Sequence, residues 1–210
     1  MRALIVLGGE APGEALLREC VRQADWTVAA DSGLAAFDAC GLEPDCIIGD
    51  MDSVAPEILA RYKDSAAIER LPCIKDETDG VHALDAAVRK GASEITLLGA
   101  LGGRPDHLLA NLMLLIRAAQ KGVRAEIRSE SLSVCRVPKR LTLYGAAGQT
   151  VSLLPLGTAE GITLTGFFYP MQNGSMDNAY PIGISNVVTE DVAEIRVERG
   201  DVLLFRFSEL

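Results

Sequence analysis

Residues 94–120 read EITLLGALGGRPDHLLANLMLLIRAAQ, and this stretch decides the fold. An apolar strand, EITLLGA, leads into an apolar helix, HLLANLMLLIRAAQ, through a short segment with Gly102, Gly103, Arg104 and Pro105. Glycine is costly to order and is favoured mainly where the backbone takes positive φ or approaches another group closely. The stretch therefore predicts a strand, a ligand-contacting loop and a helix.

The same alternation extends from the N-terminus to residue 128. Short β-branched runs alternate with helical patterns, which predicts a mostly parallel sheet with helices on both faces. We expect residues 1–128 to form a Rossmann-like α/β domain. The expected strand and helix pairs are 2–7 and 14–23, 26–30 and 34–40, 45–49 and 55–63, 66–71 and 79–90, and 94–100 and 107–120, with a closing strand at 124–128.

From Ser129 the pattern changes to strand-length pieces separated by Gly, Pro and Asn. Such spacing is typical of a β-sandwich or a barrel-like fold, so residues 129–210 are expected to be an all-β second domain, a β-sandwich. The Asn-rich stretch 171–180 is expected to be a loop. The expected strands are 132–137, 141–145, 150–156, 161–167, 184–188, 193–200 and 201–207.

Composition limits the class of protein. Apolar residues make up 49% of the 210, which is enough for a buried core, and the net charge of −9 argues against a nucleic-acid partner. The five cysteines are odd in number and form no CxxC pair, and the apolar run after Met1 is too short for a signal peptide. We expect a cytoplasmic protein that binds a small molecule, with no membrane segment.

Two acids directly after the strand CIIG indicate a cation site. Asp50 and Asp52 are two residues apart, so an extended backbone would place both carboxylates on one side. Two carboxylates about 4 Å apart repel by roughly 4 kcal/mol at an effective dielectric near 20, and a cation between them removes that penalty. Mg²⁺ suits such a pair because it binds oxygen ligands and is commonly shared with substrate phosphates.

Two other loops allow more than one interpretation. Asp31, before Ser32 and Gly33, could be a helix N-cap or a polar group of the site. The pair Gly8 and Gly9 could present N–H groups to a phosphate or could only serve the packing of the first strand. These residues alone do not decide either question.

Cations and capping groups in the next two loops indicate a polyphosphate. Helix capping explains the acids of KDETD, whereas Lys75 stands at the unfavourable end of the helix dipole. Arg104 offers a planar fork of donors matched to phosphate oxygens, although it could simply pair with Asp106 at the surface. The expected phosphate-facing residues are Lys75, Asp76, Thr78, Gly102, Gly103, Arg104, His107 and Asn111.

Taken in order, five segments closely resemble the thiamin pyrophosphokinase family across nearly the whole chain. They are ADSG, PDCIIGDMDS, KDETD with its Ala-rich helix, GALGGRPDHLLAN, and GFFYP followed by PIGISN. The resemblance implies an enzyme that transfers the β,γ-pyrophosphoryl group of ATP to thiamin, with Mg²⁺ required. It also implies a homodimer whose active site lies at the subunit interface.

The resemblance also implies roles for individual residues. Among the acids, the proton acceptor stays open between Asp31, Asp50 and Asp106. The implied metal acids are Asp50, Asp52 and Asp79; the phosphate cations Lys75 and Arg104; the polar lining of the catalytic cleft Asp31, Asp106 and Asn111; and the thiamin-side residues Ser185 and Asn186.

Two rival functions remain at this point. One is a pyrophosphokinase of the same fold that acts on another primary alcohol, such as a hydroxymethyl pterin, against which PIGISN and the second domain count. The other is a regulatory module that binds Mg-nucleotide without turnover. The group Phe167, Phe168 and Tyr169 could be core or could form a platform for a flat cation such as thiazolium.

Overall fold

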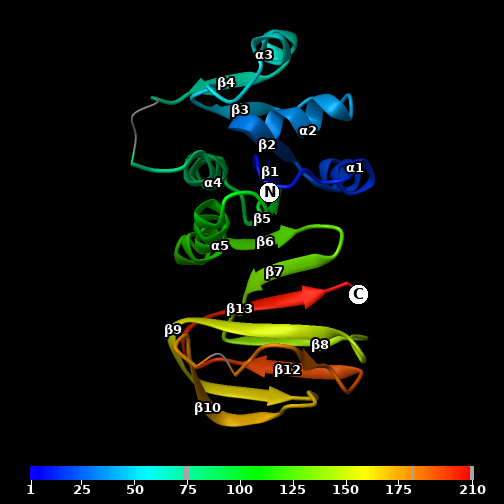
Figure 1. Cartoon of the computed structure of the whole chain (residues 1–210), viewed down its shortest axis with the longest axis vertical. Helices are drawn as coiled ribbons and strands as arrows, with labels where there is room; N and C mark the ends of the chain where they lie inside the picture. Colours follow the sequence, from blue (N-terminus) through cyan, green and yellow to red (C-terminus); the bar gives the residue numbers. More distant parts are fainter. Residues whose placement is uncertain (73–75, 181, 209–210) are drawn as a thin grey trace. The chain divides into compact units, whose positions relative to one another are not determined.

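A computed structural model of the chain describes residues 1–72, 76–180 and 182–208 (Figure 1). The chain divides into two units, Met1–Glu130 and Ser131–Leu210. Helices and parallel strands make up the first, and antiparallel strands make up the second, so the protein is of the mixed α/β class. Within the described ranges, no helix combines the length and the apolar character needed to cross a bilayer.

The sheet of the first unit is parallel throughout, in the order β4-β3-β2-β1-β5-β6. Every residue of β2 and β3 is buried, as expected for central strands that are covered on both faces. The strands are β1 (Arg2–Val6), β2 (Trp26–Ala30), β3 (Cys46–Gly49), β4 (Ala67–Arg70), β5 (Glu94–Leu98) and β6 (Arg124–Arg128).

Helices cover this sheet. Buried side chains of α1, α2 and α3 form one cluster with Leu4, Val6 and Ile47, which share one face of the strands. Helix α4 packs near Leu7, which points to the other face, and lies beside α5 (Figure 1). The helices are α1 (Glu14–Gln23), α2 (Leu34–Ala39), α3 (Pro56–Tyr62), α4 (Asp79–Arg89) and α5 (Pro105–Gln120), with the 3₁₀-helix η1 (Asp31–Gly33) before α2.

In the second unit the strands are antiparallel around one long strand, β9. The order is β7-β13-β9-β12-β8, and β10 and β11 also pair with β9. Alternate side chains of these strands fill a core that includes Val151, Ile162 and Leu204. The strands are β7 (Leu132–Arg136), β8 (Arg140–Tyr144), β9 (Thr150–Thr165), β10 (Met171–Asp177), β11 (Asn186–Val187), β12 (Val192–Arg196) and β13 (Arg199–Phe207).

Two expectations for this unit are wrong. The predicted strands 150–156 and 161–167 are one strand, β9, in which Gly157 and Gly161 take positive φ of 80° and 66°. The predicted loop 171–180 is mostly strand β10, paired with β9. Asn and Gly are poor strand formers, but pairing with β9 and the burial of Met176 outweigh that weak local preference.

Candidate active site

A cavity of about 560 Å³ opens where the parallel strands of the first unit end. In open α/β sheets this edge is where ligands bind. Asp31 lines the cavity after β2, and Thr78 and Asp79 line it at the start of α4. The loop before α5 and its first turns contribute Gly102, Gly103, Arg104, His107 and Asn111.

Three carboxylates meet at the ends of β2 and β3. One oxygen from each of Asp31, Asp50 and Asp52 lies within 4.8 Å of the others. Asp31 and Asp50 are partly buried, whereas Asp52 is exposed. The parallel register pairs Ala30 with Ile48, so the residues that follow the two strands come together.

The backbone at these strand ends brings the acids together. Asp31 and Met51 take positive φ of 47° and 66°, which few residues other than glycine adopt. Met51 is buried in the core, and it separates Asp50, which is partly buried, from Asp52, which is exposed. A Cβ at Gly49 would lie 3.0 Å from Cβ of Asp31, so a glycine at this position lets the two loops approach.

The acid cluster fits a hard divalent cation. Oδ1 of Asp31 is buried and has no hydrogen-bond partner within the described part of the chain. Burial raises the pKa of the Asp31 carboxyl, and the charges of Asp79 and Asp50 raise it further. A set of carboxylate oxygens alone is the donor set that Mg²⁺ and Ca²⁺ prefer, and a bound cation would relieve this repulsion.

The cluster differs from the predicted metal set in one member. The sequence predicts Asp50, Asp52 and Asp79, whereas the structure groups Asp31 with the first two. Asp79 lines the same cavity, and its charge acts on Asp31. The sequence predicts Asp31 in the polar lining of the cleft, but its closeness to Asp50 follows from the pairing of β2 with β3.

The structure does not favour the N-cap interpretation of Asp31. Neither η1 nor α2 has a side-chain capping hydrogen bond, and Asp31 is the first residue of η1 rather than its cap. Thr78, by contrast, is a true N-cap, since its hydroxyl oxygen accepts a hydrogen bond from the Val81 N–H at 3.4 Å. Asp76 is exposed, and the predicted Lys75 lies outside the described residues.

Around the start of α5, the predicted donors already have intramolecular partners. Arg104 donates to both carboxylate oxygens of Asp106, at 3.1 and 2.6 Å, and both side chains are exposed. Asn111 donates from Nδ2 to the Ala100 carbonyl at 2.9 Å, which ties the helix to the loop after β5. Gly102 and Gly103 take positive φ of 73° and 69° beside them.

The ion pair of Arg104 and Asp106 gives a prediction for titration. Hydrogen bonding from Arg104 lowers the pKa of Asp106 to about 2. Because the pKa of Asp106 is lower in the folded state, the ion pair stabilises the fold fully above the unfolded pKa of about 3.9. This contribution to the free energy of unfolding is lost as pH falls through about 2. Carbon-13 NMR of the carboxyl at low salt should give a midpoint near 2, which Arg104→Met moves to about 4. A wild-type midpoint near 4 would show that the pair does not persist in solution.

The second unit holds the two predicted thiamin-side residues. Ser185 is exposed with a positive φ of 55°, and its N–H donates to Oγ of Ser152 at 3.0 Å. Asn186 is buried, and its side chain bonds to the backbone. Its Oδ1 accepts from the N–H groups of Tyr169 and Val187, and its Nδ2 donates to the Tyr169 carbonyl at 2.9 Å. Asn186 therefore fixes the backbone of Tyr169.

The aromatic group before Pro170 divides between core and surface. Phe167 is buried. Phe168 and Tyr169 are 63% and 62% exposed, with ring centroids 4.9 Å apart in an edge-to-face arrangement. Two aromatic side chains of the second unit are therefore available to a ligand or a partner.

Sequence reasoning missed three polar residues of the cavity, Ser32, Ser53 and Glu77. Ser53 donates to Oδ1 of Asp52 at 2.8 Å. Glu77 stands inside the motif KDETD, directly before the capping Thr78. Its position next to an N-cap was the only available signal, and that signal is also typical of an ordinary helix start.

Two family models match the chain. The model described as thiamin pyrophosphokinase, catalytic domain, matches residues 17–127, and the model described as thiamin pyrophosphokinase, vitamin B1 binding domain, matches residues 135–202. The first model alone covers more than half of the sequence.

Individual proteins agree with these matches. Thiamine pyrophosphokinase 1 of Oryza sativa subsp. japonica is 30% identical over 166 residues, which are 73% of this chain and 62% of the rice protein's length. Thiamine pyrophosphokinase of Bacillus subtilis is 25% identical over 87% of both chains. The crystal structure of thiamin pyrophosphokinase from Geobacillus thermodenitrificans has a TM-score of 0.83 and 30% identity, and the match covers 100% of this chain and 98% of that one.

Proposed function

The chain belongs to the thiamin pyrophosphokinase family, and we propose that it transfers the β,γ-pyrophosphoryl group of ATP to the primary hydroxyl of thiamin, giving thiamin diphosphate and AMP. The observation that supports this most directly is the arrangement of the cavity. Asp31 lines the cavity together with Arg104 and the start of α4. Asp50 and Asp52 lie beside Asp31 in the acid cluster at the strand ends. Metal-binding acids beside anion-binding groups suit a polyphosphate with its cation.

Mg²⁺ is the proposed metal, with Asp50 and Asp52 as ligands, Asp31 beside them and Asp79 completing the acidic wall. Oxygen-only donors and the buried, unpartnered Oδ1 of Asp31 within the described residues support this assignment. When bound, Mg²⁺ would supply charge neutralisation for the polyphosphate.

The cationic side of the site binds phosphate oxygens. The N-terminus of α4, capped by Thr78, directs the positive end of its dipole to the cavity. The guanidinium of Arg104 exchanges Asp106 for phosphate, because each offers two oxygens that can accept from its fork of N–H donors. Gly102 and Gly103 allow the backbone to approach a phosphate closely. The other residues proposed to surround the nucleotide are Lys75, Asp76, His107 and Asn111.

Chemistry requires that the thiamin hydroxyl loses a proton as it attacks the β-phosphorus. A carboxylate within hydrogen-bond reach accepts it, and the best acceptor has the least depressed pKa. Asp106, with a pKa of about 2 while Arg104 is paired with it, is a poor acceptor until phosphate takes Arg104 from it. Burial raises the pKa of Asp31, so Asp31 is a better acceptor than Asp106 in that paired state.

The second unit, which we take to be a β-sandwich, contributes the thiamin side. Ser185 is exposed and offers a hydroxyl. Phe168 and Tyr169 offer exposed aromatic faces, to which a flat cation such as thiazolium is attracted. Asn186 acts through the backbone of Tyr169 and not by direct contact.

A homodimer is the proposed assembly, with the active site completed at the interface between subunits. Tyr180, Ile182 and Ile184 are 72%, 46% and 50% exposed, and exposed apolar side chains close together are typical of interaction surfaces. Light scattering of the purified protein tests this proposal, since a mass of one chain would contradict it.

A cytoplasmic location is also proposed. Cys20, Cys40 and Cys46 are free thiols. Free thiols persist in reducing compartments, whereas exported proteins commonly pair them. Fractionation of cells that express a tagged chain would test this location.

An assay of both products tests the proposed reaction. Purified protein is mixed with ATP, Mg²⁺ and thiamin, and AMP and thiamin diphosphate are followed by chromatography. We expect equal amounts of the two, lost on addition of EDTA or omission of thiamin. ADP with thiamin monophosphate would place attack at the γ-phosphorus instead, and no product would exclude thiamin as substrate.

A further inference from the structure

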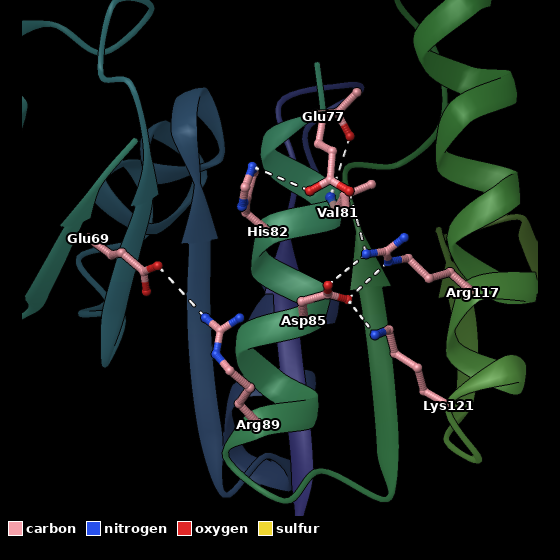
Figure 2. Close-up of polar contacts among 9 residues, drawn as sticks. Glu69, Glu77, Val81, His82, Asp85, Arg89, Arg117 and Lys121 are labelled. Atoms are coloured by element: carbon pink, nitrogen blue, oxygen red, sulfur yellow. Dashed lines mark hydrogen bonds and ion pairs between the residues drawn. The ribbon is translucent and has the colours of Figure 1, made fainter. Parts of the chain in front are cut away.

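An ion-pair cluster joins α4 to α5 (Figure 2). It reaches the wall of the cavity through Glu77. Its members are Glu77, His82, Asp85, Arg117 and Lys121. Of these, Glu77 alone lines the cavity among the described residues. We refer to these five residues as the Arg117 cluster.

Asp85 holds the guanidinium of Arg117 in one orientation. Nε and Nη2 of Arg117 donate to the two carboxylate oxygens of Asp85 at 3.0 and 2.7 Å. This hydrogen bonding lowers the pKa of Asp85, and Nζ of Lys121 lies 3.4 Å from the same carboxylate. A bidentate Arg–carboxylate pair fixes geometry as well as charge. Arg117 is therefore a fixed cation on the side of α5 that faces α4.

Glu77 lies between two nitrogen-bearing groups that are outside the cavity. Its Oε1 is 3.6 Å from Nη2 of Arg117, and its Oε2 is 3.8 Å from Nε2 of His82 (Figure 2). The side chain is about half exposed, at 48%. Arg117 attracts the carboxylate toward the groove between the helices.

A carboxylate at this position conflicts with a polyphosphate in the cavity. Glu77 precedes Thr78 and Asp79, which form the end of α4 that directs its dipole to the ligand. Like charges repel over several ångströms even in water, and the repulsion grows as the site loses solvent. The charge of Glu77 must therefore be neutralised or directed away for an anionic ligand to bind well.

We propose that Arg117 is a positioning residue that draws the Glu77 carboxylate away from the polyphosphate and neutralises its charge. This inference rests on the proposed function, because it assumes a nucleotide polyphosphate in the cavity. Arg117 acts through Glu77 and does not touch the ligand, since it does not line the cavity.

Calorimetric binding of ATP with Mg²⁺ to the full chain tests this role. Arg117→Met should raise the dissociation constant about three- to tenfold, and Glu77→Gln in the same background should return it to near the wild-type value. Glu77→Gln alone should bind as tightly as wild type or more tightly. Arg117→Lys, which keeps a cation, should stay within about twofold. The loss in Arg117→Met should shrink as salt rises from about 0.05 to 0.5 M.

Arg89→Met is the matched control. Arg89 lies in the last turn of α4, at the end away from the cavity, and pairs with Glu69 at 3.8 Å (Figure 2). It should leave binding unchanged, and thermal unfolding of each variant reports whether it folds. Should Arg117→Met not fold, Arg117→Lys and Glu77→Gln still carry the test.

Three results would overturn the inference. They are an unchanged affinity in folded Arg117→Met, a loss that Glu77→Gln does not rescue, and a weaker affinity in Glu77→Gln alone. The second would mean that Arg117 only supports the packing of the helices. If wild-type protein bound no ATP with Mg²⁺, the proposed function itself would fail, and this inference would fail with it.

Discussion

Replacing Asp50 with Asn is expected to lower thiamin diphosphate formation by roughly 10²- to 10³-fold while the protein stays folded. Asp50 supplies one of the carboxylate oxygens that meet within 4.8 Å at the strand ends. Asn keeps the side-chain volume and one oxygen. That oxygen can still accept the Asp52 N–H, as Oδ1 of Asp50 does at 3.2 Å. The loss of activity should therefore come from the missing negative charge, which the cation requires.

Stability distinguishes loss of charge from loss of fold. Asp31 and Asp52 repel Asp50, so removal of one charge should change the melting temperature by less than about 4 °C. Asp64→Asn is the matched control, because Asp64 is 89% exposed just after α3 and lies outside the acid cluster. If Asp50→Asn retained near wild-type turnover, the assignment of Asp50 to the metal would be wrong.

The sequence predicted local structure well where local signals and burial agree. Residues 14–23 form helix α1 as predicted, because an amphipathic period and charged ends act together. Residues 94–98 and 105–120 confirm the strand and helix of the opening stretch, with Pro105 in the first helical turn.

Prediction failed where distant parts of the chain decide the structure. β10 contains Asn173 and Gly174 and forms only because β9 supplies its partner. The Asp31 carboxylate joins Asp50 because two strands separated in sequence are adjacent in the sheet, a fact of register and not of local pattern. For the same reason, the sequence alone could not place Glu77 at the site, since its partner Arg117 lies on another helix.

Replacing Gly9 with Ala is expected to cost about 3 kcal/mol or more of the free energy of unfolding. A Cβ at Gly9 would lie 2.5 Å from the carbonyl oxygens of both Gly99 and Leu101. The neighbouring backbone cannot withdraw easily, because the Gly9 N–H donates to Gly99 at 2.8 Å and the Glu10 N–H donates to Leu101 at 2.7 Å. Urea denaturation of the full chain measures the loss.

The result also decides why this sequence has glycine after its first strand. If Gly9 served mainly to let a phosphate approach its N–H closely, Gly9→Ala would fold normally and lose only affinity for ATP, because the Cβ would crowd the phosphate. That N–H, however, already bonds to Gly99. Gly103→Ala is the matched control on the same cavity wall, since its φ is 69° and a Cβ there would meet nothing within 4 Å. It should cost only about 1 kcal/mol, from the positive φ alone. A loss in Gly9→Ala no larger than in Gly103→Ala would mean that packing does not require glycine here.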